Sequence, residues 1–222
     1  MWYQKRSAWA VLIAALCVFA LISYNVVKAG PLVRLDTSLA SWLHAHATPT
    51  LTQVMLLVSH AHDPIFIDAY SLIFAIVLAR WREWAWIVGL AAAAPGGLLL
   101  NGLIKRLFER ARPSLDDPLL TLTTFGFPSG HTAGAMLFYG TLSAYLLSGA
   151  HSSRLRGGAL ALWFLMVILV GSSRMYLGVH YLSDVLGGAA WSLGWLTLCL
   201  IAVRTLQQCA QPQTSMPRST GV

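Results

Sequence analysis

Six long apolar runs divide this chain of 222 residues, and the charged residues fall almost entirely between them. About twenty apolar residues in helical form span the hydrocarbon core of a bilayer. Only 10% of the residues are charged, whereas a soluble domain carries about 25%. The pattern predicts an all-α integral membrane bundle of six transmembrane helices, at residues 8–27, 64–79, 84–104, 131–147, 157–172 and 181–203.

The two ends of the chain differ in character. Lys5 and Arg6 precede the first apolar run, an arrangement that membrane spans share with cleavable signal peptides. The run is long for a signal peptide, and the sequence Asn-Val-Val-Lys at 25–28 is a poor cleavage site, so we expect a retained span. The C-terminal end turns polar. We therefore divide the chain into a membrane domain at 1–206 and a polar, disordered cytoplasmic tail at 207–222.

Two shorter stretches after the first run are amphipathic. Apolar side chains recur at helical spacing in residues 35–47, and again after Pro49; the positions are Leu35, Leu39, Trp42 and Leu43, then Leu51, Val54, Met55 and Val58. This spacing predicts short helices that lie in the membrane interface. Four histidines lie in the same region, at positions 44, 46, 60 and 62. Members of a His-x-His pair point to different sides of a helix, so we interpret them as interfacial polar residues rather than metal ligands.

The net charge of +7 does not indicate a nucleic-acid partner. The lysines and arginines are scattered at the ends of apolar runs and form no basic stripe. Basic flanks of this kind favour anionic lipid head groups. Cys17, Cys199 and Cys209 show no C-x-x-C spacing, so neither a zinc site nor a disulfide framework is indicated. No obligate protein partner is indicated either.

Six spans would place both termini on one side of the membrane. Eight of the lysines and arginines fall on that side and seven on the other. Three of the seven belong to the candidate site described next, which leaves a clear excess on the side of the termini. The positive-inside rule then places the termini in the cytoplasm and the candidate site on the outer face.

The segment from Arg174 to Asp184 groups polar residues where two apolar runs nearly meet. His180 and Asp184 are four apart, so they would share one face if this part of the chain is helical. An aspartate that accepts the Nδ1 proton leaves Nε2 with a nucleophilic lone pair. Arg174 supplies a planar fork that fits phosphate oxygens. The grouping suggests covalent phosphoryl transfer, although a histidine–aspartate pair at this spacing also arises by chance.

A second cluster opens the fourth run, where Ser129, Gly130 and His131 follow a proline. Ser129 is a natural N-cap, and a helix N-terminus attracts anions. Gly130 lets the backbone approach an oxyanion closely, and His131 stands where it could protonate a leaving oxygen. A plain capped helix with an interfacial histidine would show the same residues.

A third cluster follows the third run. Lys105 and Arg112 are seven apart, and they could lie on one face of an extended helix end or be gathered by the loop. Together they would provide a point charge and a planar fork. We interpret the neighbouring Arg106 and Arg110 as ordinary interfacial anchors.

In chain order, the clusters read Lys-x6-Arg-Pro, Pro-Ser-Gly-His and Ser-Arg-x5-His-x3-Asp. This series resembles the three-part signature of the type 2 phosphatidic acid phosphatase superfamily, and the resemblance covers residues 35–203. It implies that His180 attacks phosphorus to form a phosphohistidine, that Asp184 orients it, and that His131 is the general acid. The residues implied to bind the phosphate are Lys105, Arg112, Ser129, Gly130 and Arg174.

The resemblance also implies a class of substrate, because the membrane-spanning members act on lipid phosphates and need no metal or other cofactor. We therefore expect hydrolysis of undecaprenyl pyrophosphate or of a broad range of phospholipid phosphates, in a bacterial inner membrane, with the lipid bilayer and the lipid phosphate as partners. Two alternatives stay open. One is a lipid phosphotransferase that passes the phosphoryl group to another lipid, and the other is a non-catalytic membrane transporter of the same fold.

Overall fold

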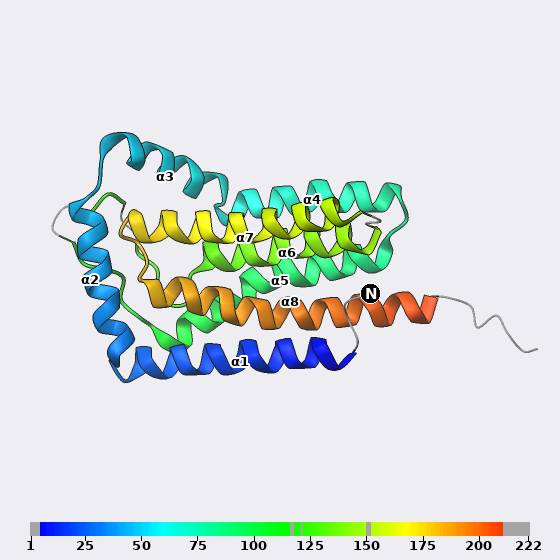
Figure 1. Ribbon diagram of the computed structural model, residues 1–222, viewed down its shortest axis with the longest axis horizontal. Helices are drawn as coiled ribbons and strands as arrows, with labels where there is room; N and C mark the ends of the chain where they lie inside the picture. The colour runs from blue at the N-terminus through cyan, green and yellow to red at the C-terminus, as the bar shows by residue number, and fades with distance from the viewer. Residues whose placement is uncertain (1–4, 116–117, 121, 150–151, 211–222) are drawn as a thin grey trace, which may run out of the picture.

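The computed structural model describes residues 5–115, 118–120, 122–149 and 152–210. Within these ranges the chain forms eight helices and no strand: α1 Lys5–Val27, α2 Pro31–Ala45, α3 Pro49–Ala61, α4 Pro64–Arg80, α5 Trp84–Phe108, α6 Gly130–Gly149, α7 Ser153–Tyr176 and α8 Leu182–Ala210. The long helices run side by side along the long axis of the molecule, and α2 crosses one end of the bundle (Figure 1). The all-helical fold class predicted from the sequence is therefore confirmed.

Each predicted apolar run corresponds to one long helix, with different ends. Helix α5 continues past residue 104 to Phe108, and α8 continues past residue 203 to Ala210. Helix α7 already begins at Ser153, where the Ser152 hydroxyl accepts a hydrogen bond from the Leu155 amide. The predicted tail at 207–222 thus starts inside α8, and its residues 211–222 lie outside the described ranges.

The number of spans is not confirmed. In the described part of the chain, α1, α5, α7 and α8 are long and apolar enough to cross a membrane, and α3 with α4 adds a fifth candidate if this pair, bent by 51°, is one span. Helix α6 does not qualify because it is rich in small and hydroxyl residues. It packs against α4, α5, α7 and α8, and half of its residues are buried, namely Thr132–Phe138, Gly140, Thr141 and Ser143. A helix enclosed by other helices needs no apolar surface toward lipid.

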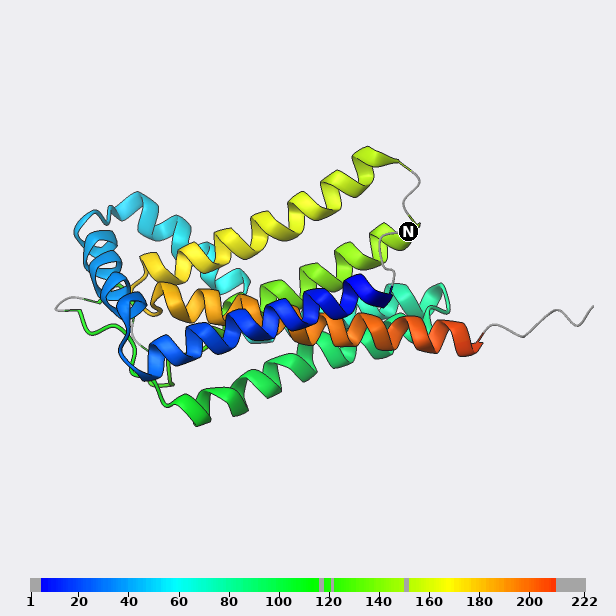
Figure 2. The same cartoon turned by 60° about the horizontal axis from the view of Figure 1, so that its bottom comes forward.

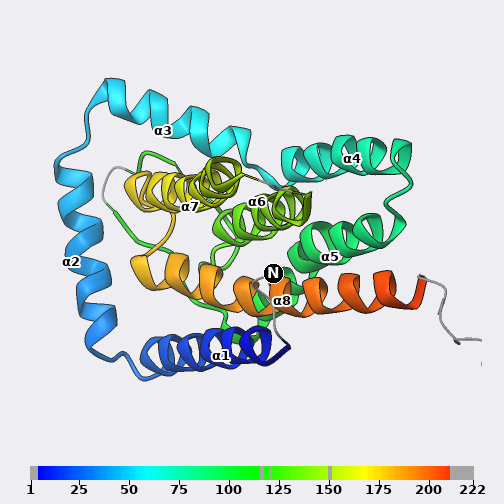
Figure 3. The same ribbon diagram turned by 45° about the vertical axis from the view of Figure 1, so that its right-hand side comes forward.

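Helix α2 crosses the end of the bundle, whereas α3 extends from that end toward α4 (Figure 3). Helix α2 begins four residues earlier than predicted, at Pro31, whose fixed φ suits the first helical position. Its predicted apolar stripe faces outward, with Leu35 and Trp42 exposed. Asp36, beside this stripe, points inward and is completely buried. This orientation suits a helix at a membrane surface that attaches itself to the bundle through a polar contact.

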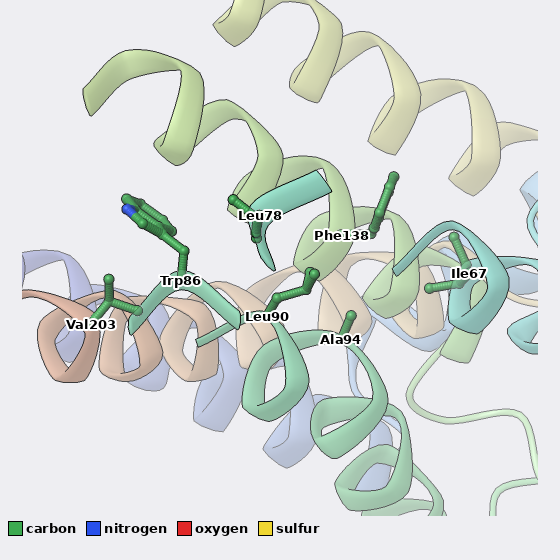
Figure 4. Packing of buried hydrophobic residues seen from close by; sticks show 7 residues of the cluster. All are labelled: Ile67, Leu78, Trp86, Leu90, Ala94, Phe138 and Val203. Atoms are coloured by element: carbon green, nitrogen blue, oxygen red, sulfur yellow. The ribbon is translucent and has the colours of Figure 1, made fainter. Parts of the chain in front are cut away.

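The main core lies between α4, α5, α6 and α8. Trp86, Leu90 and Ala94 of α5 meet Phe138 and Val203 in one buried cluster (Figure 4). Small residues bring the helix axes close together. A Cβ on Gly97 would lie 2.4 Å from Leu137 Cδ1 of α6. The Pro-Gly-Gly segment at 95–97 thus makes a close helix contact inside an unbroken α5.

The histidines between the first two spans have separate roles. His62 is buried, and its ring bonds the Val58 carbonyl at 2.8 Å and the Tyr139 hydroxyl at 3.0 Å. His60 is exposed and contacts Asp63. Among the described residues, no three His, Cys, Asp or Glu side chains form a group that could hold a metal. His62 is therefore a core residue rather than an interfacial one.

Helix α8 packs closely against the start of α6. It packs against α1, α5 and α6, and α1 crosses in front of it in the turned view (Figure 2). A Cβ on Gly188 would lie 2.7 Å from the carbonyl oxygen of Ser129. Because a backbone oxygen cannot turn aside as a side chain can, any larger residue at 188 must displace the start of α6.

We expect Gly188→Ala to lower the melting temperature of the purified protein in detergent, because overpacking costs about 1–3 kcal/mol. Gly158→Ala is the matched control, since a Cβ there meets nothing within 4 Å. Alanine is favoured over glycine in a helix by about 1 kcal/mol. Gly158→Ala should therefore leave the melting temperature unchanged or raise it slightly. Equal melting temperatures of the two variants would contradict the close contact between α6 and α8.

Candidate active site

The three clusters singled out in the sequence meet at one end of the bundle, close to where α2 crosses it (Figure 1). Helix α5 brings Lys105 to this end, α7 brings Arg174, and α6 and α8 both begin there. Arg112 reaches the same place from the loop after α5, so the loop, rather than one helix face, gathers the two cations.

His180 and Asp184 contact each other, but not as residues of one helix face. His180 precedes α8, and Asp184 lies in its first turn. The Tyr181 amide donates to Asp184 Oδ2 at 2.9 Å, and the Asp184 amide donates back to the Tyr181 carbonyl at 3.1 Å. The bond from the Tyr181 amide, which is one half of a capping box, holds the carboxylate in place. His180 Nδ1 then lies 3.3 Å from Oδ2.

The other ring nitrogen of His180 faces a cation. Arg112 Nη1 lies 3.2 Å from His180 Nε2. The guanidinium is held by backbone carbonyls: Nη1 donates to Val179 at 2.6 Å and Nε donates to Thr124 at 2.6 Å. A phosphate bound by Arg112 would therefore sit next to Nε2.

The charge state of His180 suits a nucleophile. The side chain is only 2% exposed, and this burial lowers the pKa of His180 to about 3, although the Asp184 carboxylate opposes the shift. The imidazole is therefore neutral at pH 7. With the proton on Nδ1 toward Asp184, the free lone pair is on Nε2.

Lys105 and Arg112 hold the same stretch of backbone. The Lys105 ammonium donates to the Phe125 carbonyl at 2.6 Å and to the Gly126 carbonyl at 3.2 Å. Arg112 Nη2 donates to the Phe125 carbonyl at 3.2 Å. Lys105 therefore keeps one of its three donors for an anion. All five donors of Arg112 have partners, and an anion would have to replace His180 Nε2 or Thr124 Oγ1 to bind this guanidinium.

Arg174 is buried, with 1% of the residue exposed. One terminal nitrogen donates to the Ser59 hydroxyl of α3, and its backbone carbonyl accepts from the amides of Val179 and His180. Its Nε is buried and has no hydrogen-bond partner among the described residues. A buried guanidinium donor without a partner is costly, and a phosphate oxygen would satisfy it.

The start of α6 faces the same space. Ser129 is fully buried, its amide donates to the Asp184 carbonyl at 2.9 Å, and its hydroxyl accepts from Thr132 Oγ1 at 3.1 Å. Next to it, Gly130 leaves little room: an added Cβ would lie 3.2 Å from Asn101 Nδ2. His131 follows in the first turn, and its Nε2 lies 2.8 Å from Asp63 Oδ1.

Arg110 is not the plain interfacial anchor that the sequence suggested. Its Nη1 donates to Asp184 Oδ1 at 2.6 Å and to Ser183 Oγ at 2.5 Å, and its Nη2 donates to Asp36 Oδ2 at 2.8 Å. The guanidinium also lies over the Tyr181 ring, 4.7 Å from its centroid. The prediction was wrong because nothing in the local sequence shows that two buried carboxylates from α2 and α8 converge on this side chain.

Sequence reasoning also missed Asp36, Asp63 and Ser59, which lie outside the recognised motifs. A signal for the two aspartates existed. The chain has only eight acidic residues, and a carboxylate at the end of a membrane helix is costly without a cation or hydrogen-bond donor. Each aspartate in the interfacial segment was therefore a candidate partner for an arginine or histidine.

A helical bundle with four or five candidate membrane spans among its described residues, and with two histidines and three cations at one end, defines a membrane protein with a charged site. Residues 84–208, more than half of the chain, match the family model of the PAP2 superfamily. The chain therefore belongs to the PAP2 superfamily, and the resemblance noted in the sequence is confirmed.

Individual relatives agree with this assignment. The chain is 32% identical over 155 residues to Phosphatidylglycerophosphatase B of Bacillus subtilis, which covers 69% of this chain and 74% of the relative. It is 31% identical over 136 residues to the Undecaprenyl-diphosphatase of the same organism, which covers 55% of this chain and 64% of the relative. The crystal structure of a transmembrane PAP2 type phosphatidylglycerolphosphate phosphatase from Bacillus subtilis superposes with a TM-score of 0.71 at 26% identity, covering 93% of this chain and 98% of that one.

We expect Arg110→Ala to destabilise the protein strongly and to reduce turnover, because it leaves the carboxylates of Asp36 and Asp184 buried without their cation. Removing one partner of a buried ion pair costs about 3–5 kcal/mol. Arg106→Ala is the control, since Arg106 is exposed on the same helix end. Melting temperature and phosphate release should fall for Arg110→Ala and stay near wild type for Arg106→Ala. Similar values for both would restore the interpretation of Arg110 as a simple anchor.

Proposed function

We propose that this protein hydrolyses a lipid phosphate or diphosphate through a phosphohistidine on His180. The observation that carries the proposal is the placement of the two imidazole nitrogens, with Nδ1 toward Asp184 at 3.3 Å and Nε2 toward Arg112 at 3.2 Å. One contact fixes the tautomer, and the other brings a phosphate to the lone pair.

The steps follow from these positions. The cations Lys105, Arg112 and Arg174 and the amides at the start of α6 neutralise the phosphate oxygens and the charge that develops in the transition state. Nε2 of His180 attacks phosphorus, and the bond to the leaving oxygen breaks as His131 protonates it. His131 then takes a proton from water, which attacks the phosphohistidine and releases inorganic phosphate.

A lipid is the substrate that fits a site at the end of a membrane bundle. The tail can stay in the bilayer while the head group reaches Arg112. A cavity of about 250 Å³ next to Arg112 is lined by apolar residues of the same loop, among them Leu115, Leu120 and Leu122. The relatives named for lipid phosphatases support the same class. Undecaprenyl pyrophosphate and phospholipid phosphates are the two groups of head group that we propose to test.

The decisive experiment is a phosphate-release panel with the purified protein in detergent, across lipid monophosphates and diphosphates, with EDTA present. Full activity in EDTA supports a mechanism in which protein cations stabilise the charge without a metal. Phosphate release without any acceptor lipid supports a hydrolase, whereas release only on addition of an acceptor identifies a phosphotransferase. No turnover of any lipid phosphate would favour the transporter alternative.

We expect His180→Ala to abolish phosphate release while the protein still folds. Asp184→Asn keeps the shape of the side chain but removes the charge that orients the imidazole, and we expect a loss of about 10⁴-fold in kcat, by analogy with other buried aspartate–histidine pairs. Quenching of wild-type enzyme with ³²P-labelled substrate in alkaline SDS, in which the P–N bond of phosphohistidine survives, should trap label on the protein, and His180→Ala should trap none. More than trace activity in His180→Ala would remove this residue as nucleophile.

We further propose that the chain crosses a bacterial inner membrane six times, with α6 as the enclosed span, the termini in the cytoplasm and the site on the outer face. The excess of lysine and arginine at the far end of the bundle supports this orientation. The site would then meet lipids of the outer leaflet.

The orientation predicts different labelling at the two ends. In a background without Cys17, Cys199 and Cys209, a cysteine at Ser114 should react with a membrane-impermeant thiol reagent in intact cells. A cysteine at Ser153, which is exposed at the other end of the bundle, should react only after the membrane is opened. The reverse pattern would place the site on the cytoplasmic face.

A further inference from the structure

The corner between α3 and α4 brings a carboxylate to the general acid. Asp63 lies between these helices, and its Oδ1 is 2.8 Å from His131 Nε2. Its Oδ2 is 3.2 Å from His60 Nδ1. Ser59, one helical turn earlier, bonds Arg174. The corner therefore borders the site at both Arg174 and His131.

The side chain of Asp63 does not cap its own helix. Asp63 is the N-cap residue of α4, yet its side chain accepts no hydrogen bond from a helix amide. About a third of the side chain, 34%, is exposed. Both oxygens face imidazoles, and hydrogen bonding of this kind stabilises the ionised form of a carboxyl group. Asp63 thus places a negative charge beside His131.

We propose that Asp63 makes this site selective for lipid phosphate monoesters over lipid diphosphates. The inference rests on the proposed function, and it narrows the substrate class of the same site. The carboxylate affects the proton transfer from His131, and it affects the departure of a charged leaving group. Both effects favour the monoester.

The first effect concerns the proton. When His180 Nε2 forms its bond to the phosphorus of a monoester, the electron pair of the breaking P–O bond goes to an alkoxide oxygen. An alkoxide is a strong base, so the proton on His131 must move to it as the bond breaks. Asp63 stabilises the protonated imidazole that gives this proton, and it orients the neutral imidazole that next takes a proton from water. A diphosphate releases a phosphate instead, a far weaker base that departs without protonation.

The second effect concerns charge. The leaving group of a monoester is neutral once protonated. The leaving group of a diphosphate is itself a phosphate ester, with a charge of about −1.5 to −2 near neutral pH. It would depart next to His131, and hence near the Asp63 carboxylate, where like charges repel. Asp63 thus assists the monoester reaction and opposes the diphosphate reaction.

Farnesyl phosphate and farnesyl diphosphate provide a matched test, because they differ only in the number of phosphates. Initial rates are measured from the appearance of farnesol from the monoester, and of farnesyl phosphate plus farnesol from the diphosphate. The variant is Asp63→Asn, which keeps the size of the side chain and removes its charge. Asp68→Asn is the control, since it makes the same change on an exposed residue of α4 away from the site.

Wild type and Asp68→Asn should prefer the monoester to the same degree. In Asp63→Asn, kcat/KM for the monoester should fall at least about tenfold, given the 10²- to 10⁴-fold that general acid–base catalysis typically supplies. The diphosphate rate should stay equal or rise. The ratio of the two rates comes from one preparation, so it does not depend on the fraction of folded enzyme.

Two outcomes would overturn the inference and leave the proposed function standing. In one, Asp63→Asn lowers both rates equally, which means that Asp63 serves only the fold or the general position of His131. In the other, the ratio stays at the wild-type value. If wild type cleaves neither compound, or if cleavage survives His180→Ala, the proposed function itself fails and this inference fails with it.

Discussion

The carboxylate of Asp184 is the group on which the site depends. It lies almost completely buried at the start of α8 and is surrounded by donors: the Tyr181 amide, the His180 ring and the Arg110 guanidinium. A buried charge is tolerated only when it is paired and hydrogen-bonded. Arg110 meets this condition, and it also binds a second carboxylate, Asp36 of α2, which lies 74 positions earlier in the chain. The contact that orients His180 and the contact that attaches α2 to the bundle thus belong to one hydrogen-bond network.

The membrane explains why these groups lie where they do. In the hydrocarbon core every polar group must be satisfied within the protein, so a cluster of ionisable side chains is least costly at the ends of helices. Lys105, Arg174 and Asp184 all lie in a terminal turn of their helix. The middle of the bundle is held instead by close packing, as where Gly97 of α5 meets Leu137 of α6. The charged residues of the candidate site therefore lie at the ends of the helices, and the packing contacts that stabilise the bundle lie in the middle of the same helices.

The apolar runs and the motifs could be predicted from the sequence because both are local. A run of apolar residues predicts a helix, and Pro-Ser-Gly-His predicts the start of one, independently of the rest of the chain. Arg110 and Asp36 could not be paired in this way, because their contact depends on how α2 folds back over the end of the bundle. The apolar stripe of α2 could be recognised in the sequence, but its outward orientation could not. The one aspartate of this helix, Asp36, makes the contact with Arg110.

Helix α6 was predicted as a membrane span from its apolar pattern, but it is not among the helices that are long and apolar enough to cross a membrane. It carries Gly130 and His131 at its start, and it packs against four other helices, α4, α5, α7 and α8. An anion bound at a helix N-terminus is stabilised by the free amides and the helix dipole only where water and lipid do not compete. Cations from the ends of α5 and α7 must also reach that N-terminus. Both requirements favour a helix enclosed by the others, and an enclosed helix packs best through small and hydroxyl residues. The small and hydroxyl residues of α6 therefore fit its position between the other helices.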